Sequence, residues 1–498
     1  MARNFISRKP YVSLMKTSPS FPLLFVRHRH RLMRVAVAGA FLLAFAGCVT
    51  KPPAYYGANN TPPTGDDYSL AFVELGEFGS YKDRTQIGNA VQLIAKKQRP
   101  LLVTYIHGWH NGVTSGDVGK FKKFLNRLAH SPMVKSSNLD VVGVYLAWPG
   151  DSFRVPVLST FTFWDRKRAA ERIASNSDCL DSILELSRAA RQRPKSYTIL
   201  LGHSFGGLIL ERAVAHTVQT LQGQQAVKAP WDLALVLNPA SDAVLSRQMV
   251  VGLQQLYAQG DSSSASMSSS GQGSTENKPM IVELASENDQ ATQLTFPIGT
   301  SIGAFIGAHW GWNKVDVPAR DVADRNSISE RAFYLSTPGN NPFLINYAVQ
   351  HRDDSSADGE NDAFDANLHR NRDDRVFYTS APRKAEAPNL PAEGGGRAPK
   401  SATTEWHRWQ IVPASEVGKK YKGDPRVPYW VIRVPSHIID NHGGIWSENS
   451  MAMMAAIFRL SFPLPATKGG LDLVPGPMSV LPKRAPNLPA KSYPQTKS

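Results

Sequence analysis

Short apolar runs alternate with stretches of helical periodicity along most of the chain. Most of these runs are unbroken by polar residues, and they lie at Leu70–Leu75, Leu101–Ile106, Val141–Trp148, Tyr197–Leu201, Leu233–Leu237, Met280–Leu284 and Tyr429–Val434. Unbroken apolar runs are typical of parallel strands, which are buried on both faces. Helical spacing separates them, as at Leu210, Val214, Val218 and Leu221. This alternation predicts an α/β fold, with a mostly parallel sheet and helices on both of its faces.

Long polar segments interrupt the pattern. Residues 259–278 are rich in Ser and Gly, and residues 350–403 combine an Asp-rich run with a Pro- and Gly-rich one. Such compositions favour surface insertions over packed elements. We therefore expect one folded domain over residues 69–463 with these two insertions. A Pro-rich tail follows at 464–498, for which we predict disorder.

The N-terminal region has the pattern of an export signal. An uncharged stretch of thirteen residues, Val35–Gly47, follows a segment rich in arginine. A membrane-spanning helix needs about 20 residues, so this stretch is too short. A basic flank, a short apolar run and small residues at its end are typical of a secretory signal peptide. A start at Met33 would leave a compact signal.

The residues that follow resemble a lipoprotein processing site. Ala46-Gly47-Cys48 is similar to the lipobox of bacterial lipoproteins, although Phe45 stands where Leu is usual. The resemblance implies a signal peptide over 1–47, lipidation of Cys48, a tether over 48–68 and a membrane-anchored protein in the bacterial cell envelope. Val49 after the cysteine, in place of Asp, implies sorting to the outer membrane. The alternative is an uncleaved apolar anchor with an incidental cysteine.

Charge and cysteine content narrow the function classes. The chain has 498 residues and a net charge of +15, but eight of its Lys and Arg lie in residues 1–47 and four in residues 475–498, with no acid in either segment. The chain between these two segments has a net charge of only +3, which does not indicate a phosphate-binding surface, so we expect no nucleic-acid partner. Two cysteines exclude a disulfide framework. Cys179 lies in an amphipathic stretch, which predicts a buried, inert thiol.

The motif Gly202-His203-Ser204-Phe205-Gly206 stands between a predicted strand and a predicted helix. A serine on a sharp strand–turn–helix needs glycines around it, because strand and helix approach closely there. The turn exposes the hydroxyl at a helix N-terminus, where amide dipoles favour negative charge. Ser204 is therefore the candidate nucleophile. The alternative is an ordinary glycine-rich turn with a capping serine.

Acyl transfer also needs two backbone donors for the developing oxyanion. One would be the amide of Phe205, next to the nucleophile. The other would come from His107-Gly108-Trp109-His110-Asn111-Gly112, directly after a predicted strand, and we place it on Trp109. Neither histidine of this segment has a third ligand at a recognisable spacing, so we expect no metal site. His107 is interpreted as a structural hydrogen-bonding residue.

A serine nucleophile needs a base and a carboxylate that orients the base. Asp289 follows the strand Met280–Leu284, and His442 follows the last predicted strand in a turn-forming loop. This gives the chain order Ser, acid, His, with each residue at the carboxyl end of a strand. Glu287 and Asp242 stay open as alternative acids, and His437 as an alternative base.

Together these motifs resemble the α/β-hydrolases of the serine esterase and lipase group, over roughly residues 70–463. The resemblance is most specific at 202–207 and 107–112, and the phrase from Ser286 to Thr292 is similar to the acid loop of bacterial relatives. It implies an α/β-hydrolase fold and hydrolysis of small-molecule or lipid esters through an acyl-enzyme, with no cofactor. The aromatic segment 302–312 would line the acyl pocket or pack in the core.

Two other hypotheses use the same residues differently. One is a catalytically silent hydrolase-like lipoprotein that binds an envelope partner through its insertions. The other is an acyltransferase that passes the acyl group to an alcohol other than water. The sequence does not indicate the oligomeric state.

Overall fold

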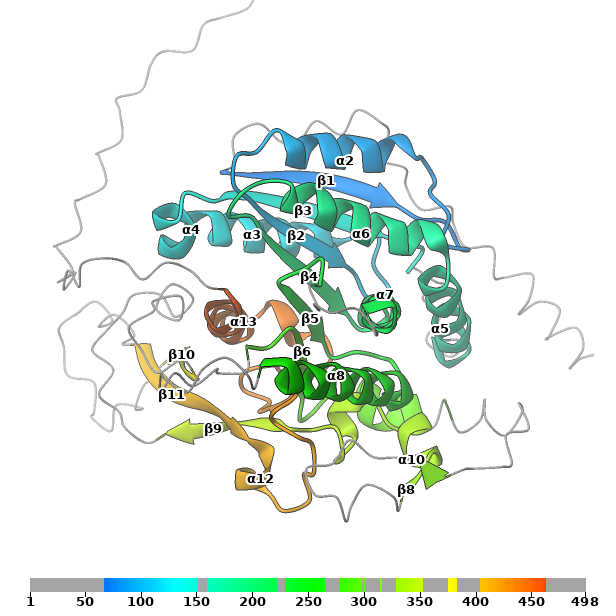
Figure 1. The fold of residues 1–498 in the computed structure, drawn as a ribbon, viewed down its shortest axis with the longest axis vertical. Helices are drawn as coiled ribbons and strands as arrows, with labels where there is room; N and C mark the ends of the chain where they lie inside the picture. Colours follow the sequence, from blue (N-terminus) through cyan, green and yellow to red (C-terminus); the bar gives the residue numbers. More distant parts are fainter. Residues whose placement is uncertain are drawn as a thin grey trace, which may run out of the picture.

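A ten-stranded sheet runs through the molecule (Figure 1), in the order β1-β3-β2-β4-β5-β6-β12-β9-β11-β10. The computed structural model describes residues 67–150, 159–221, 229–264, 278–297, 300, 314–315, 328–352, 375–382 and 404–462. From β1 to β9 every neighbouring pair is parallel. β11 pairs antiparallel with β9, and β10 pairs antiparallel with β11. The described chain is therefore an α/β fold with a mostly parallel sheet.

The strands of this sheet are β1 (Tyr68–Glu74), β2 (Pro100–Ile106), β3 (Asp140–Ala147), β4 (Tyr197–His203), β5 (Leu233–Leu237), β6 (Ile281–Ser286), β9 (Tyr347–Arg352), β10 (Val376–Pro382), β11 (Thr404–Pro413) and β12 (Tyr429–Val434). Every apolar run that the sequence analysis assigned to a strand overlaps one of them, with ends that differ by a residue or two. A separate pair is formed by β7 (Lys314–Val315) and β8 (Ile328–Ser329).

The α-helices are α2 (Thr85–Ala95), α3 (Gly116–His130), α4 (Pro132–Ser136), α5 (Ser159–Ala174), α6 (Ser177–Arg191), α7 (Phe205–Leu221), α8 (Ala243–Ser264), α10 (Arg331–Tyr334), α12 (Ala414–Val417) and α13 (Glu448–Ser461). The other helical turns are η1 (Ala291–Thr295), a π-helix, and the 3₁₀ turns η3 (Pro338–Asn340) and η4 (Gly444–Trp446).

Helices cover both faces of the sheet (Figure 1), as the sequence predicts. Buried side chains of α2, α5, α6, α7 and α8 pack in one apolar core, and those of α3, α4 and α13 pack in a second core on the opposite face. Local signals fix where some helices begin. The side chain of Asn176 caps α6 and that of Ser447 caps α13, each accepting a hydrogen bond from an amide of the first turn.

The antiparallel strands were not predicted. β10 lies inside the segment 350–403 that the sequence analysis assigned to a surface insertion, and β9 and β11 flank that segment. On β11, Trp409 and Ile411 belong to the second core, whereas Gln410 between them pairs with Gln350 of β9 on the other face. In the other insertion, α8 continues to Ser264, beyond the expected start of the loop at 259.

Several predictions lie outside the described residues. These are the signal peptide 1–47, Cys48, most of the tether, the segment 302–312 and the tail 464–498. The prediction for Cys179 is confirmed: its side chain is buried in α6, and burial raises the pKa of the thiol to about 12. In the described part of the chain, no helix has both the length and the apolar character needed to cross a membrane.

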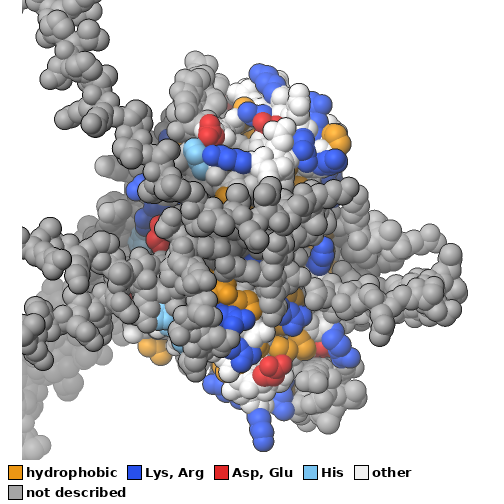
Figure 2. Space-filling view, turned by 90° about the vertical axis from the view of Figure 1, so that its left-hand side faces the viewer, with side chains coloured by type: hydrophobic (Ala, Val, Ile, Leu, Met, Phe, Trp, Pro, Cys, Tyr) orange, Lys and Arg blue, Asp and Glu red, His pale blue; other side chains and the backbone are white. Residues whose placement is uncertain are grey.

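Figure 2 shows one face of the molecule in space-filling form. Lys and Arg side chains on the visible described surface are spread among acidic, polar and hydrophobic ones and do not gather in one patch.

Candidate active site

Ser204 occupies the sharp turn between β4 and α7. Its φ is +55°, a left-handed conformation that costs a non-glycine residue on the order of 1–3 kcal/mol. A Cβ on Gly206 would lie 2.2 Å from the carbonyl oxygen of Ile106 and 2.4 Å from that of His107. Only glycine therefore allows α7 to begin this close to the end of β2. The strained turn holds the serine at the carboxyl end of β4.

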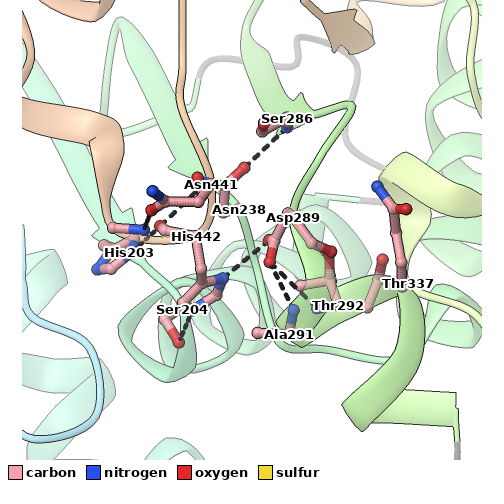
Figure 3. Close-up of polar contacts among 12 residues, drawn as sticks. His203, Ser204, Asn238, Ser286, Asp289, Ala291, Thr292, Thr337, Asn441 and His442 are labelled. Carbon is pink, nitrogen blue, oxygen red and sulfur yellow. Dashed lines mark hydrogen bonds and ion pairs between the residues drawn. The ribbon is translucent and has the colours of Figure 1, made fainter. Parts of the chain in front are cut away.

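The serine contacts a histidine that is far away in sequence (Figure 3). The Nε2 atom of His442 lies 2.7 Å from the Oγ atom of Ser204, and its Nδ1 atom lies 2.8 Å from the Oδ2 atom of Asp289. The carboxylate can only accept, so Nδ1 carries the proton and Nε2 accepts from the serine hydroxyl. The three side chains form one chain of hydrogen bonds in the order that general-base catalysis requires.

Both oxygens of Asp289 are held. Oδ1 accepts hydrogen bonds from the amides of Ala291 at 3.0 Å and Thr292 at 3.2 Å, at the start of η1, which leaves Oδ2 for His442. The side chain is buried, and burial alone would raise the pKa of Asp289. Hydrogen bonds from His442 and Thr292 and the charge of His442 outweigh burial, so the pKa is lowered. The acid is therefore a fixed carboxylate at neutral pH.

The alternative residues do not join this chain. Glu287 is exposed, and Nδ1 of His442 is bonded to Asp289 instead. The carboxylate of Asp242 has Lys167, Arg212 and Glu171 as its electrostatic neighbours.

His437 also lies apart from the serine. Its ring packs on Trp409, with centroids 4.3 Å apart, over the antiparallel strands. Burial, followed by the charges of His407 and His351, lowers its pKa. The geometry thus favours Asp289 and His442.

The predicted oxyanion loop lies against Ser204. A Cβ on Gly108 would be 2.9 Å from the Cβ of Ser204 and 2.8 Å from Nδ1 of His203, so only glycine lets the loop after β2 come so near. The next residue, Trp109, packs edge-on against Phe163 and tilted against Phe205. Phe205 opens α7, where the first amides have no partner within the helix. Both predicted donors therefore flank the serine.

His107 anchors this loop, as expected of a structural residue. Its Nδ1 donates to the carbonyl of Gly108 at 2.9 Å, and its Nε2 accepts from the amide of Trp148 at 3.2 Å. The indole of Trp148 donates in return to the carbonyl of His107 at 2.7 Å. Burial lowers the pKa of His107 and keeps the ring neutral.

The loop that carries His442 is fastened to the acid strand. The amide of Asn441, whose φ is +50°, donates to Oδ1 of Asn288 at 2.8 Å. The amide group of Asn288 donates to Asp440 at 2.9 Å, and Ser286 donates to the carbonyl of Ile439 at 2.6 Å. These contacts lock the acid and base loops in one arrangement.

Two residues that the sequence analysis did not assign to the site hold the same loop from the other side. Nε2 of His203 lies 2.9 Å from the backbone carbonyl of His442, and Nδ2 of Asn238 lies 3.0 Å from it. Asn238 also donates to the carbonyl of Asn441 at 3.1 Å and accepts from the amide of Ser286 at 2.9 Å. Both are polar residues at the carboxyl ends of parallel strands, which is the position that could have indicated their role from the sequence.

A second polar cluster is buried between α7, β6 and β12. The Tyr429 hydroxyl lies 3.1 Å from Oε1 of Glu211 and 3.2 Å from Oε2 of Glu283. Ser246 donates to Glu211 at 3.1 Å, and Ser241 also donates to Glu211. Burial, and then the charge of Glu211, raise the pKa of Glu283 well above its usual range, and burial raises that of Glu211 to about 7.

The tyrosine hydroxyl has one hydrogen and cannot donate to both carboxyl groups at once. Glu211 has the serine donors, which favour its charged form, and the pKa of Glu283 is raised well above its usual range, so Glu283 is assigned as the neutral acid that donates to the Tyr429 oxygen. This bridge joins α7, which begins beside Ser204, to β6, which precedes Asp289, and to β12, which precedes His442.

In the described ranges, no group of three or more His, Cys, Asp or Glu side chains is arranged to hold a metal ion. Comparison with family models, curated proteins and solved structures found no match to this chain.

Proposed function

We propose that the protein is a serine hydrolase of the α/β-hydrolase class, which cleaves carboxylic esters through an acyl-enzyme. The observation that carries the proposal is the continuous chain of hydrogen bonds from Ser204 through His442 to Asp289, with distances of 2.7 and 2.8 Å. The chain order of the three residues and their position at the carboxyl ends of parallel strands support the same class.

In the first half of the reaction, the Oγ atom of Ser204 attacks the ester carbonyl carbon while Nε2 of His442 takes the hydroxyl proton. Asp289 keeps Nδ1–H of His442 pointing toward it and stabilises the imidazolium that forms. The amides of Phe205 and Trp109 donate hydrogen bonds to the carbonyl oxygen and stabilise the negative charge that develops on it. Each of these hydrogen bonds lowers the barrier by about 3–4 kcal/mol. Collapse breaks the bond to the leaving alcohol, which receives its proton from His442.

The second half repeats these steps with water. His442 removes a proton from the water as the oxygen attacks the acyl carbon, and it then returns that proton to Ser204 as the carboxylic acid leaves. Atoms and protons balance over the two halves.

We also propose that the substrates include lipid esters and that the enzyme works at a membrane. Support comes from the lipoprotein-like Ala46-Gly47-Cys48. An acyl-anchored enzyme reaches esters that partition into the bilayer without first extracting them into water.

Turnover of p-nitrophenyl butyrate tests the proposal. The wild-type protein is expected to give a burst of nitrophenol followed by steady turnover, as an acyl-enzyme requires. Ser204→Ala and His442→Gln should each lose at least a thousandfold in kcat, since the parts of a triad act as a unit. Folded wild-type protein without turnover of any short-chain ester would contradict the proposal.

A further inference from the structure

We propose that His203 is a positioning residue for the base: its ring N–H holds the backbone carbonyl of His442 and so fixes the imidazole between Ser204 and Asp289. This inference rests on the proposed function and adds to it a residue that does not itself contact the reacting atoms.

The geometry determines which ring nitrogen carries the proton. Nε2 of His203 faces the carbonyl oxygen of His442 at 2.9 Å, and a carbonyl can only accept. Nε2 must therefore be protonated. Nδ1 lies on the other side of the ring, against Gly108, where a Cβ would come within 2.8 Å of it. The ring thus separates the predicted oxyanion loop from the base loop and contacts both.

The environment keeps this ring uncharged. His203 is buried, and burial, followed by the charge of His442, lowers its pKa to about 4, although the carboxylates of Asp117 and Asp289 act in the opposite direction. The two imidazole rings are 5.1 Å apart. A neutral His203 can therefore hold the carbonyl while His442 becomes an imidazolium, whereas a second charge at this distance would oppose that step.

The carbonyl of His442 has a second donor. Nδ2 of Asn238 reaches the same oxygen at 3.0 Å, and Oδ1 of Asn238 accepts from the amide of Ser286 on the acid strand. A carbonyl oxygen has two lone pairs, so His203 and Asn238 together saturate it. Loss of one donor frees the loop to shift, and a shift of about 1 Å at the base costs on the order of 10²-fold in rate.

His203→Phe and His203→Gln test the role. Phe fills the space without a donor, and Gln supplies an N–H at a similar reach. We expect His203→Phe to lower kcat and the rate of labelling by a small fluorophosphonate by the same factor, about 10- to 100-fold, with KM unchanged. His203→Gln should recover most of this loss. His216→Phe, on an exposed position of α7, is the matched control and should match the wild type.

The controls separate this inference from the proposed function. If the wild type is not labelled, the proposed function fails. If the wild type is labelled and folded His203→Phe is labelled equally fast, only the role of His203 is overturned. The tautomer can also be measured in the wild-type protein by ¹⁵N-histidine NMR at pH 7, which does not depend on a variant folding. A neutral ring protonated at Nε2 supports the inference, and protonation at Nδ1 overturns it.

Discussion

The buried acid Glu283 adds a pH dependence to stability that one substitution should remove. Glu283→Gln replaces a neutral carboxylic acid with an amide of the same shape, whose N–H can donate to the Tyr429 oxygen as the acid does. The variant therefore keeps the bridge but has no proton to lose.

The size of the pH effect on the free energy of unfolding follows from the one proton that Glu283 binds. Glu283 has a raised pKa in the folded protein and a pKa of about 4.3 when unfolded. Its contribution is fully present below the unfolded pKa and is lost as pH rises toward the folded pKa. Over that window the folded state holds one more proton than the unfolded state, so the wild type loses about 1.4 kcal/mol per pH unit through this group. Glu283→Gln lacks this loss, and its stability should fall less steeply with pH.

Urea unfolding at intervals between pH 5 and 8 measures the effect. The expected result is a difference in slope of about 1.4 kcal/mol per pH unit between wild type and Glu283→Gln over the lower part of this range. Glu287→Gln, at an exposed position just after the same strand, serves as the control and should follow the wild type. Parallel curves for wild type and Glu283→Gln would refute the assignment of a buried neutral acid.

Three further predictions concern the site and the anchor. Gly206→Ala places a Cβ 2.2 Å from a backbone oxygen and should abolish activity and lower the melting temperature, whereas Gly119→Ala, with open space around it, should leave activity intact and raise stability by about 1 kcal/mol in urea unfolding. Asp289→Asn should lower kcat on the order of 10³- to 10⁴-fold in ester turnover while Asp242→Asn retains most activity; the reverse ranking would make Asp242 the acid. Cys48→Ser should move the expressed protein from the membrane to the soluble fraction, and unchanged membrane association on fractionation would contradict lipid anchoring there.

The strands β1 to β6 and β12 could be predicted because burial on both faces gives unbroken apolar runs. Each unbroken apolar run became a strand, and the glycine-flanked Ser204 became a strained turn. The antiparallel strands could not be predicted in the same way. Their partners are set by pairing between segments distant in sequence, such as Trp409 opposite His351, and polar residues such as Gln410 interrupt their apolar residues.

The sequence indicated the candidate catalytic residues, but it did not indicate the residues that hold them in place. Motif order indicated Ser204. The choice of Asp289 over Glu287 and Asp242, and of His442 over His437, depended on the paths of loops. His203 and Asn238 donate to the backbone carbonyl of His442, and a contact to the backbone cannot be predicted from the pattern of side chains. One signal was available but unused: a glutamate inside an apolar run, as at Glu283, indicates a buried polar partner.

The central claim, that Ser204 is a nucleophile activated by His442, is tested most directly by intact-mass spectrometry after treatment with a fluorophosphonate. The account predicts one phosphonyl adduct per chain, mapped to Ser204 by peptide sequencing. It also predicts no adduct on Ser204→Ala and slow labelling of His442→Gln. An adduct on another residue, or none on the folded wild type, would contradict the account.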